Sequence, residues 1–220
     1  MRRLANVVRE SRAKIGYREV RGILGKNFVS PEDIGRERGI NYGRKLLRQF
    51  SETLPPEDVV CWLRDNDYVL ISGPPLPMLL SGIYQALGVP IRLVRIGKRT
   101  FSQEYGMSSA LKGVQDRVST HWFMVRGIPY RDSVNKVLDD QKALLLGIEH
   151  VPNLAEMMWC VAACKAVHNV KLLPHILVRT ASTLNGNSLH VGEVTDDGMV
   201  IGSSWRTFKS IVLGIASARK

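Results

Sequence analysis

The residues best suited to chemistry near the start of the chain are cations. Eight of them precede residue 27, where only two acidic residues occur: Arg2, Arg3, Arg9, Arg12, Lys14, Arg18, Arg21 and Lys26. Residues 1–50 carry thirteen Lys and Arg against five Asp and Glu, a net charge of +8, while the remaining 170 residues carry +3. Such a segment attracts phosphate-rich partners and releases their counterions on binding. The eight cations are therefore a candidate site for nucleic acid or another polyanion.

The same positive charge is consistent with three further roles. A solvated helix face keeps a protein soluble, and a protein partner or an anionic membrane surface would also use cations. The segment has no zinc-finger spacing and no nucleic-acid signature of a known type. The four tryptophans lie outside it, which weakens the case for a platform that stacks single-stranded bases: Trp62, Trp122, Trp159 and Trp205.

A second candidate site is the turn Ser72-Gly73-Pro74-Pro75, where a buried strand is predicted to lead into a helix. Open α/β folds place ligand crevices at such positions, and a helix N-terminus can hold a phosphate or carboxylate. Ser72 and Gly73 are the candidate ligand contacts. A rigid packing turn is the favoured interpretation, because the prolines remove backbone amides and no glycine-rich phosphate motif is present.

Arg179 and Ser182 are further candidate ligand contacts. A cation in an apolar strand either reaches solvent or is paired inside, and a structural pair is favoured over a substrate anion. Ser182 or Cys160 could act as a nucleophile, but no Gly-x-Ser-x-Gly elbow is present. The sequence fixes no proximity between these groups and the histidines that could serve as a base: His150, His175 and His190.

Four potential metal ligands recur every four residues along one predicted helix: Glu156, Cys160, Cys164 and His168. Only neighbouring members of such a stripe can reach one ion, and small buried thiols are the commoner outcome. Asp196-Asp197 is explained by turn geometry alone. We therefore predict neither a metal nor a cofactor.

The composition is that of a globular protein of 220 residues, with 45% apolar and 23% charged residues. Three cysteines without a Cys-x-x-Cys clamp predict no disulfide framework. The first 26 residues contain no apolar export core, so we expect a cytoplasmic protein. The uncharged stretch Tyr68–Ile91 is long enough to span a membrane, but its three clustered prolines and neighbouring glycine predict a strand, a turn and a buried helix.

The elements expected to position these residues begin with one or two helices before residue 25. Ser30, followed by Pro31 and two acids, predicts a helix start, and this helix is expected to run to Thr53 with breaks at Gly39 or Gly43. Pro55-Pro56 is the predicted boundary, followed by a short helical turn from Glu57.

Beyond the boundary the predicted strands and helices alternate. Asn153, with Glu156 three residues later, predicts a helix that ends near His168-Asn169. The turn 195–198 predicts a β-hairpin. The other expected segments are strands at 68–71, 91–96, 121–125 and 176–178, helices at 77–87 and 133–146, and a long connection at 97–118.

These patterns predict an α+β, or mixed α/β, fold. Residues 1–55 form a basic helical region, whose helices are able to pack on the rest. Residues 56–220 form one mixed-sheet domain that ends in an antiparallel hairpin.

The segments Asn66–Met78, Glu149–Glu156, Val178–Ser182 and Leu213–Lys220 occur in an order and at a spacing that point to a known family. On these segments, residues from about 60 to 220 resemble a family of uncharacterised bacterial proteins. The resemblance implies a shared fold and supplies no activity, and it is weakest at 97–118 and at 206–209.

Two function hypotheses follow from the sequence. The first is a non-enzymatic cytoplasmic binding or accessory protein, with nucleic acid or a protein as partner. The second is a small α/β enzyme or ligand-binding protein with a site near Ser72–Pro77. Whether the protein is an enzyme stays open on the sequence alone.

Overall fold

The computed structural model describes residues 15–95, 104–105, 111, 113–130, 132–195 and 197–219. Its helices are α1 (Tyr17–Leu24), the 3-10 helix η2 (Gly25–Asn27), α2 (Pro31–Arg38), α3 (Gly43–Glu52), α4 (Glu57–Asp65), α5 (Leu80–Leu87), α7 (Leu138–Lys142) and α8 (Leu154–His168). Its strands are β1 (Phe28–Val29), β2 (Tyr68–Ser72), β3 (Met78–Leu79), β4 (Ile91–Arg95), β5 (Glu104–Tyr105), β6 (Arg117–Val118), β7 (Trp122–Arg126), β8 (Glu149–His150), β9 (Leu177–Leu184), β10 (Asn187–Thr195), β11 (Gly198–Ser204), β12 (Leu213–Ile215) and β13 (Ala218–Arg219). The predicted α+β fold is confirmed.

The described strands form two large sheets and a short ribbon. The five-stranded sheet has the order β1-β2-β7-β13-β8, and the six-stranded sheet has the order β12-β9-β10-β11-β4-β5. Both are mixed: β1 and β2 run parallel while β2 and β7 run antiparallel, and β11 pairs parallel with β4 but antiparallel with β10. The strands β3 and β6 form the ribbon.

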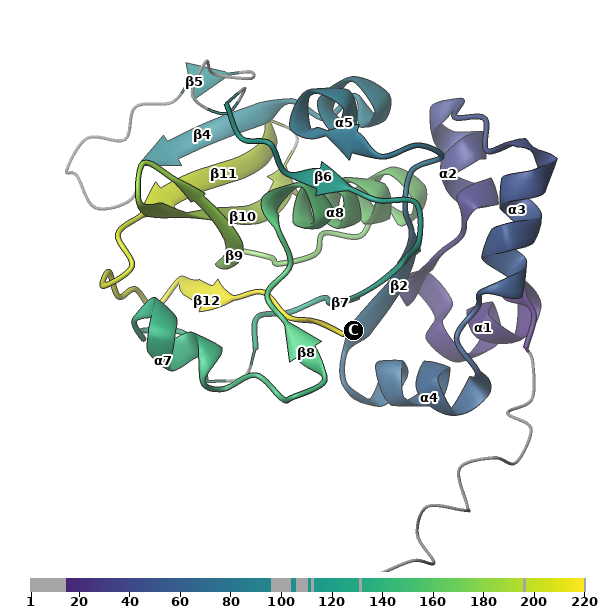
Figure 1. The fold of residues 1–220 in the computed structure, drawn as a ribbon, viewed down its shortest axis with the longest axis horizontal. Coiled ribbons are helices and arrows are strands. Elements are labelled where there is room, and N and C mark those ends of the chain that lie inside the picture. Colours follow the sequence, from purple (N-terminus) through teal and green to yellow (C-terminus); the bar gives the residue numbers. More distant parts are fainter. Residues whose placement is uncertain are drawn as a thin grey trace, which may run out of the picture.

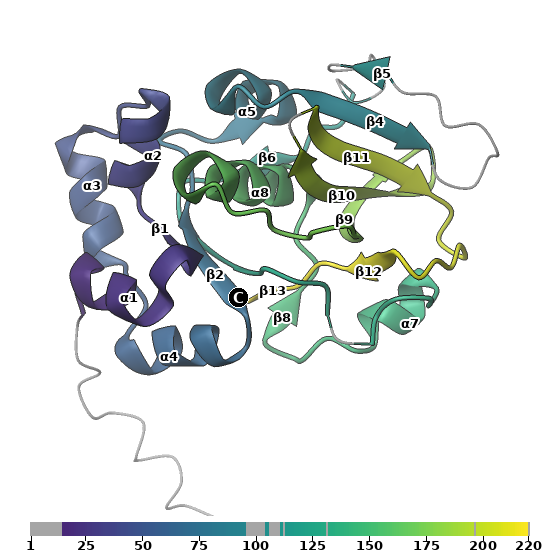
Figure 2. The ribbon, with the colours of Figure 1, turned by 180° about the vertical axis from the view of Figure 1, so that it is seen from behind.

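The helix α8 lies between the two large sheets (Figure 1, Figure 2). It contacts β2 and β7 of one sheet and β9 and β10 of the other. Every residue from Leu154 to Cys164 except Glu156 is buried, which explains this central place, because a helix that is apolar on all sides must be covered on all sides. Its predicted caps are confirmed: Asn153 and Glu156 form a capping box, and Asn169 ends the helix in a left-handed conformation.

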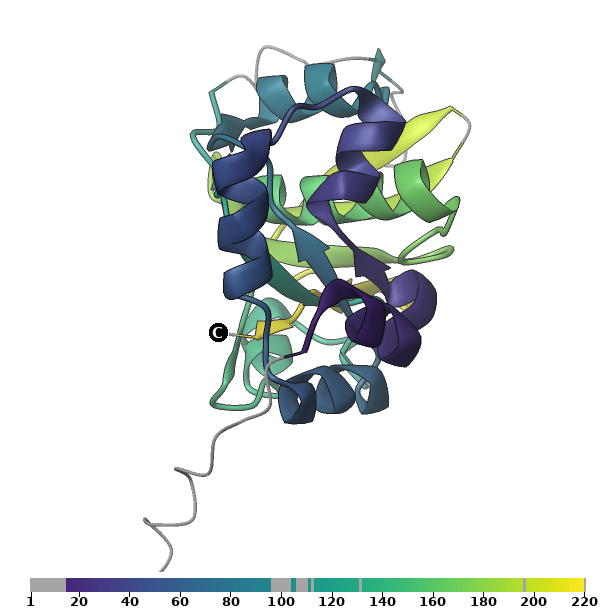
Figure 3. The ribbon, with the colours of Figure 1, turned by 90° about the vertical axis from the view of Figure 1, so that its right-hand side faces the viewer.

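Helices α1 to α4 lie together on one side of the molecule, in front of β1 and β2 (Figure 3). We call α1 to α4 the helical layer. Strand β1 joins the five-stranded sheet, with Phe28 opposite Leu70. Val20 and Phe28 belong to the same hydrophobic core as residues beyond the boundary predicted at Pro55-Pro56. That boundary is a loop between α3 and α4, and residues on both sides of it share one core.

The predicted helix from Ser30 begins as expected and is broken at both glycines. Ser30 accepts a hydrogen bond from the Asp33 amide, and the Asp33 carboxylate accepts one from the Ser30 amide. Gly39 and Gly43 both have positive φ, a conformation that glycine adopts without steric cost. The chain therefore forms two separate helices, α2 and α3.

The predicted helix at 133–146 is largely wrong, since only Leu138–Lys142 is helical. Asn135 has a φ of 55°, which interrupts a right-handed helix. Backbone amides that a helix would use internally are satisfied elsewhere: Asn135 donates to the Ser210 carbonyl and Leu138 to the Arg206 carbonyl. The segment at 205–212 therefore competes with helix formation here.

The predicted hairpin is confirmed, with Thr195 opposite Gly198. One face of its strands packs on the core through residues such as Leu189, Val191 and Ile201. Because successive residues of a strand point to opposite faces, Ser188 and His190 lie on the other face, directed away from α8. Both are nevertheless fully buried.

The stretch 68–91 folds as β2, a turn, β3, α5 and the start of β4, so the membrane-length segment is divided between elements. No helix within the described residues is long and apolar enough to cross a membrane.

Candidate functional site

Three of the eight predicted polyanion-binding cations lie in the described part of the chain: Arg18, Arg21 and Lys26. Arg2, Arg3, Arg9, Arg12 and Lys14 lie outside the described residues. Arg18 and Lys26 are exposed, and neither forms an ion pair with another described residue. Their guanidinium and ammonium groups are therefore accessible to an external anion.

Arg21 belongs to a hydrogen-bonded network around the buried carboxylate of Asp33. Its guanidinium lies 2.6 Å from one Asp33 oxygen, and Arg36 lies 2.9 Å from the other. The Ser30 hydroxyl also donates to Asp33, at 2.7 Å. Burial opposes ionisation of Asp33, but the hydrogen bonds from Arg21 and Ser30 outweigh it and hold its pKa below the usual value. Arg21 thus has a structural partner that Arg18 lacks.

The structure adds three exposed cations to Arg18 and Lys26. These are Arg38 at the end of α2, and Arg44 and Lys45 in the first turn of α3. None of them forms an ion pair with a described residue. We call the set of five the layer cations: Arg18, Lys26, Arg38, Arg44 and Lys45. They come from consecutive elements of the helical layer (Figure 3).

A hollow of about 530 Å³ lies between α3, α4 and β7. Its walls are mainly apolar, and its polar groups include His121 and Arg219. Partial burial lowers the pKa of His121, and the neighbouring His150 lowers it further. The Arg219 guanidinium lies 4.4 Å from the centre of the Trp62 ring, a cation–π contact. The loop at Pro55-Pro56, predicted as a linker, forms part of the wall.

A second hollow of about 550 Å³ adjoins the first, because Leu46 and Gln49 line both. Arg44 and Lys45 border it, and it is more open to solvent. Its remaining wall includes Leu76, whose side chain is exposed. The hollows therefore run along α3, with two layer cations at one end.

The residues of the predicted ligand turn have two roles. Ser72 and Gly73 pack in the interior, and the residues after them line the second hollow. Ser72 is fully buried, and its carbonyl accepts a hydrogen bond from the Trp159 indole at 2.7 Å. The Gly73 carbonyl accepts one from the Tyr42 hydroxyl at 2.9 Å. A Cβ at Gly73 would lie 2.1 Å from the Ser119 carbonyl oxygen, so the backbone passes too close for any side chain. Only the later residues Pro75 and Leu76 reach the hollow.

The turn does not form the ligand crevice that open α/β folds place where a strand leads into a helix. The turn leads first into β3 and only then into α5. The strands on either side, β2 and β4, belong to different sheets, so no strand-order reversal of a single sheet occurs here.

Arg179 is fully buried in β9, where only neutral groups accept its hydrogen bonds. Its Nη1 donates to Gln141 Oε1 at 2.7 Å and to the Lys136 carbonyl at 3.3 Å. Its Nη2 donates to the carbonyl of Phe208. Within the described chain it has no carboxylate partner, and burial lowers its pKa. The predicted pairing takes the form of hydrogen bonds and not of an ion pair.

Ser182 lies on the core face of β9, at the beginning of α8. Its hydroxyl donates to an Asp116 carboxylate oxygen and accepts a hydrogen bond from the Leu154 amide at 2.7 Å. The bond from Leu154 anchors the start of α8, and the bond to Asp116 joins β9 to the loop before β6. Neither bond involves a histidine, so the suggested serine–histidine pair is not assembled among the described residues.

The stripe of potential metal ligands is half inside the core, because its two cysteines are buried while Glu156 and His168 are half-buried. Cys160 and Cys164 are fully buried, and burial raises the pKa of the Cys164 thiol to about 12. A ring nitrogen of His168 lies 2.9 Å from the Phe28 carbonyl. Among the described residues, no group of three or more His, Cys, Asp or Glu is placed to hold a metal ion.

Apart from Pro75 and Leu76 of the predicted turn, the sequence did not mark the residues that line the two hollows as candidates for a site. Gln49, Thr120, His121 and Arg219 come from three distant parts of the chain and share no spacing. One signal in the sequence could have pointed to the hollows, the cationic pair Arg44-Lys45 just after Gly43. The net charge of residues 1–50 includes this pair but does not distinguish it from the other cations.

No family model, no curated protein and no solved structure matches this chain. The resemblance of residues 60–220 to uncharacterised bacterial proteins therefore stays a prediction.

Proposed function

We propose that this protein is a cytoplasmic, non-enzymatic binding protein that contacts nucleic acid through its helical layer. The observation that carries the proposal is the set of five layer cations, which are exposed and have no ion-pair partner in the described chain. Cations that are not paired internally can neutralise phosphates at little cost, whereas Arg21 would first have to leave Asp33.

The two hollows along α3 add a feature that a flat cationic surface lacks. Their apolar walls, with Arg44 and Lys45 at one end, suit a chain that presents both a phosphate and a flat base. Single-stranded nucleic acid has both, while duplex DNA hides its bases. We therefore expect single strands to bind more tightly than duplexes of the same length.

The same geometry supports a second candidate, a small ligand with an apolar body and one anionic group. It would occupy the second hollow, beside Pro75 and Leu76. Its affinity would depend on salt much less steeply, because only one or two charges would be neutralised.

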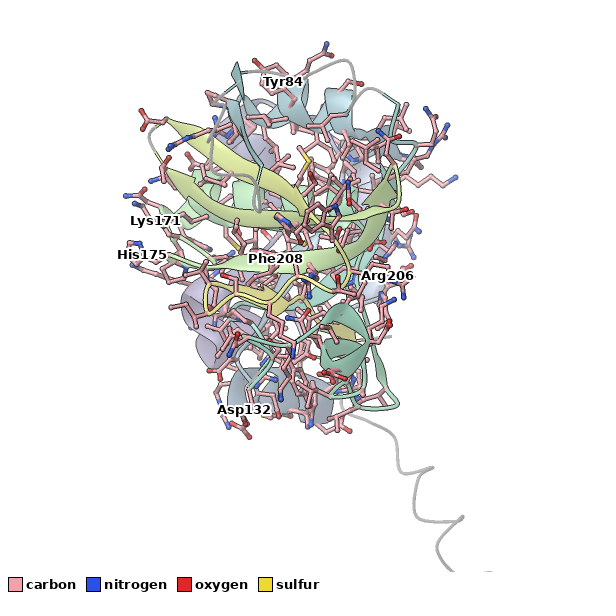
Figure 4. The ribbon with its side chains drawn as sticks, turned by 90° about the vertical axis from the view of Figure 1, so that its left-hand side faces the viewer. Tyr84, Asp132, Lys171, His175, Arg206 and Phe208 are labelled. Atoms are coloured by element: carbon pink, nitrogen blue, oxygen red, sulfur yellow. The ribbon has the colours of Figure 1, made fainter. Side chains whose placement is uncertain are left out.

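The test is a salt titration of binding to fluorescent single-stranded DNA and RNA, followed by anisotropy. The double variant Arg44→Ala/Lys45→Ala is expected to reduce the slope of log K against log salt by about 1.4, or about 0.7 for each phosphate contact on a single strand. The matched control is Lys142→Ala/Lys171→Ala, which removes two exposed cations outside the helical layer (Lys171 is labelled in Figure 4).

The proposal is wrong if the unaltered protein binds neither DNA nor RNA at low salt. It is also wrong if the control variant loses as much affinity as the layer variant. A weaker affinity of the Arg44→Ala/Lys45→Ala variant with an unchanged salt slope would instead favour the small ligand, because the two cations would then contact no phosphate of the strand.

A further inference from the structure

The first hollow, between α3, α4 and β7, has the size and the walls of a small-molecule site. Its volume of about 530 Å³ lies within the range of about 300–1,000 Å³ that is typical of such sites. Phe50 and Trp122 line it and are themselves buried. Partly buried apolar residues complete its walls: Leu46, Leu54, Pro55, Pro56, Val59 and Met124. A ligand that enters this hollow must therefore present a mainly apolar surface.

The charge of the first hollow comes from Arg219. None of the described residues that line it is acidic, and Arg219 is the only Lys or Arg among them. His121 adds no charge at neutral pH, because partial burial and the neighbouring His150 hold its pKa below the usual value. A single positive charge beside apolar walls suits a ligand that carries a single negative charge.

The Arg219 guanidinium lies at the wall that α4 provides. Its central carbon is 4.4 Å from the centre of the Trp62 ring. Trp62 and Val59 are three residues apart on α4, so they share one face of that helix, and Val59 lines the hollow. Neither an ion pair nor a hydrogen bond joins this guanidinium to another residue of the described chain. Its N–H groups can therefore donate to a ligand.

The donor set narrows the class of anion. A carboxylate carries one charge, and its two oxygens accept hydrogen bonds from two N–H groups of one guanidinium at the same time. A phosphate ester carries up to two charges near neutral pH, and the described lining offers no second cation to match them. We propose that the first hollow binds a small carboxylate with an apolar body, and that Arg219 holds its carboxylate group.

This site differs from the small-ligand candidate of the second hollow, which would use Arg44 and Lys45. It also goes beyond the nucleic-acid proposal, because it needs neither a strand nor the layer cations. A bound carboxylate and a base of a single strand would compete for the first hollow. The carboxylate is therefore tested on the protein alone.

The first test measures the dissociation constants of matched ligands by isothermal titration calorimetry. Phenylacetate and hexanoate distinguish an aromatic from an aliphatic body, and phenylacetamide and hexanamide have the same bodies without the charge. We expect at least one of the two acids to bind at one per chain and at least about tenfold more tightly than its amide, because hydrogen bonds between charged groups are stronger than those to neutral groups. Phenyl phosphate should bind more weakly than phenylacetate.

The second test uses variants of the wall. Arg219→Met keeps an apolar side chain and removes the guanidinium, so the preference for the acid over its amide should fall to about twofold or less. The matched control is Arg64→Met, which removes an exposed arginine of α4 that does not line the first hollow. Thr53→Phe, at an exposed position of the wall, should weaken acid and amide alike, because the larger side chain fills the hollow.

The proposal is overturned if neither acid binds, if each amide binds as tightly as its acid, or if Arg219→Met keeps the preference for the acid. Tighter binding of phenyl phosphate than of phenylacetate also overturns it. So does loss of the preference in Arg44→Ala/Lys45→Ala, which would place the acid in the second hollow. If Arg219→Met does not fold, the comparison of acid with amide and the Thr53→Phe variant still decide. None of these outcomes bears on the salt titration with nucleic acid, so the two proposals fail separately.

Discussion

The helical layer and the six-stranded sheet use arginine in opposite surroundings. Arg21 is partly exposed and shares the buried carboxylate of Asp33 with Arg36. Arg179 is fully buried, and its partners among the described residues are an amide oxygen and backbone carbonyls. In the first region the charge is neutralised inside the protein. In the second region no described carboxylate neutralises the charge, and hydrogen bonds to neutral oxygens hold the guanidinium instead.

Replacement of Arg179 tests the buried side of this comparison and has the largest expected effect. Arg179→Ala leaves Gln141 Oε1 and the carbonyls of Lys136 and Phe208 without a donor, so unfolding free energy should fall by about 3 kcal/mol or more. Urea unfolding measures the change. A loss below about 1 kcal/mol would mean that water satisfies these acceptors once the guanidinium is removed.

Replacement of Asp33 tests the neutralised side. Asp33→Asn weakens the interactions with Arg21 and Arg36 and part of the capping of α2, so a loss of about 1–2 kcal/mol is expected. Urea unfolding at pH 7 gives the value, and Glu32→Gln, an exposed neighbour in the same helix turn, is the control. An equal effect of both variants would show that the network has no special role.

Acid should remove the same interaction in the unaltered protein. The pKa of Asp33 is lower in the folded state, so its contribution is complete above the ordinary carboxyl pKa of about 4 and disappears as pH falls through the folded value. The stability difference between the unaltered protein and Asp33→Asn should therefore shrink as pH falls below about 4. A difference that is constant from neutral pH into strong acid would contradict the lowered pKa.

The smallest effect is expected at an exposed ion pair of the helical layer. Arg48 lies 2.7 Å from Glu52 on the surface of α3, where solvent screens the attraction. Arg48→Ala should leave the urea midpoint unchanged within experimental error. A clear destabilisation would mean that exposed pairs do stabilise this layer, which would weaken its contrast with Asp33.

Local signals determined much of the fold. The Ser30 and Asn153 caps placed two helix starts correctly, and Gly88, in a left-handed conformation, ends α5 as expected. The turn at 195–198 placed the hairpin. These features depend on interactions within a few residues, so the sequence states them directly.

Only the tertiary structure decided the rest. The segment 133–146 has helical spacing, but its amides bond to Arg206 and Ser210, and most of the helix is lost. Arg179 and His190 meet because β9 and β10 pair in one register, with an irregularity between Ser188 and His190 that no short-range pattern predicts. The hollows along α3 likewise join residues from distant parts of the chain, from Leu46 to Arg219. The sequence by itself determined caps, turns and charge, whereas long-range packing decided which polar groups are buried together.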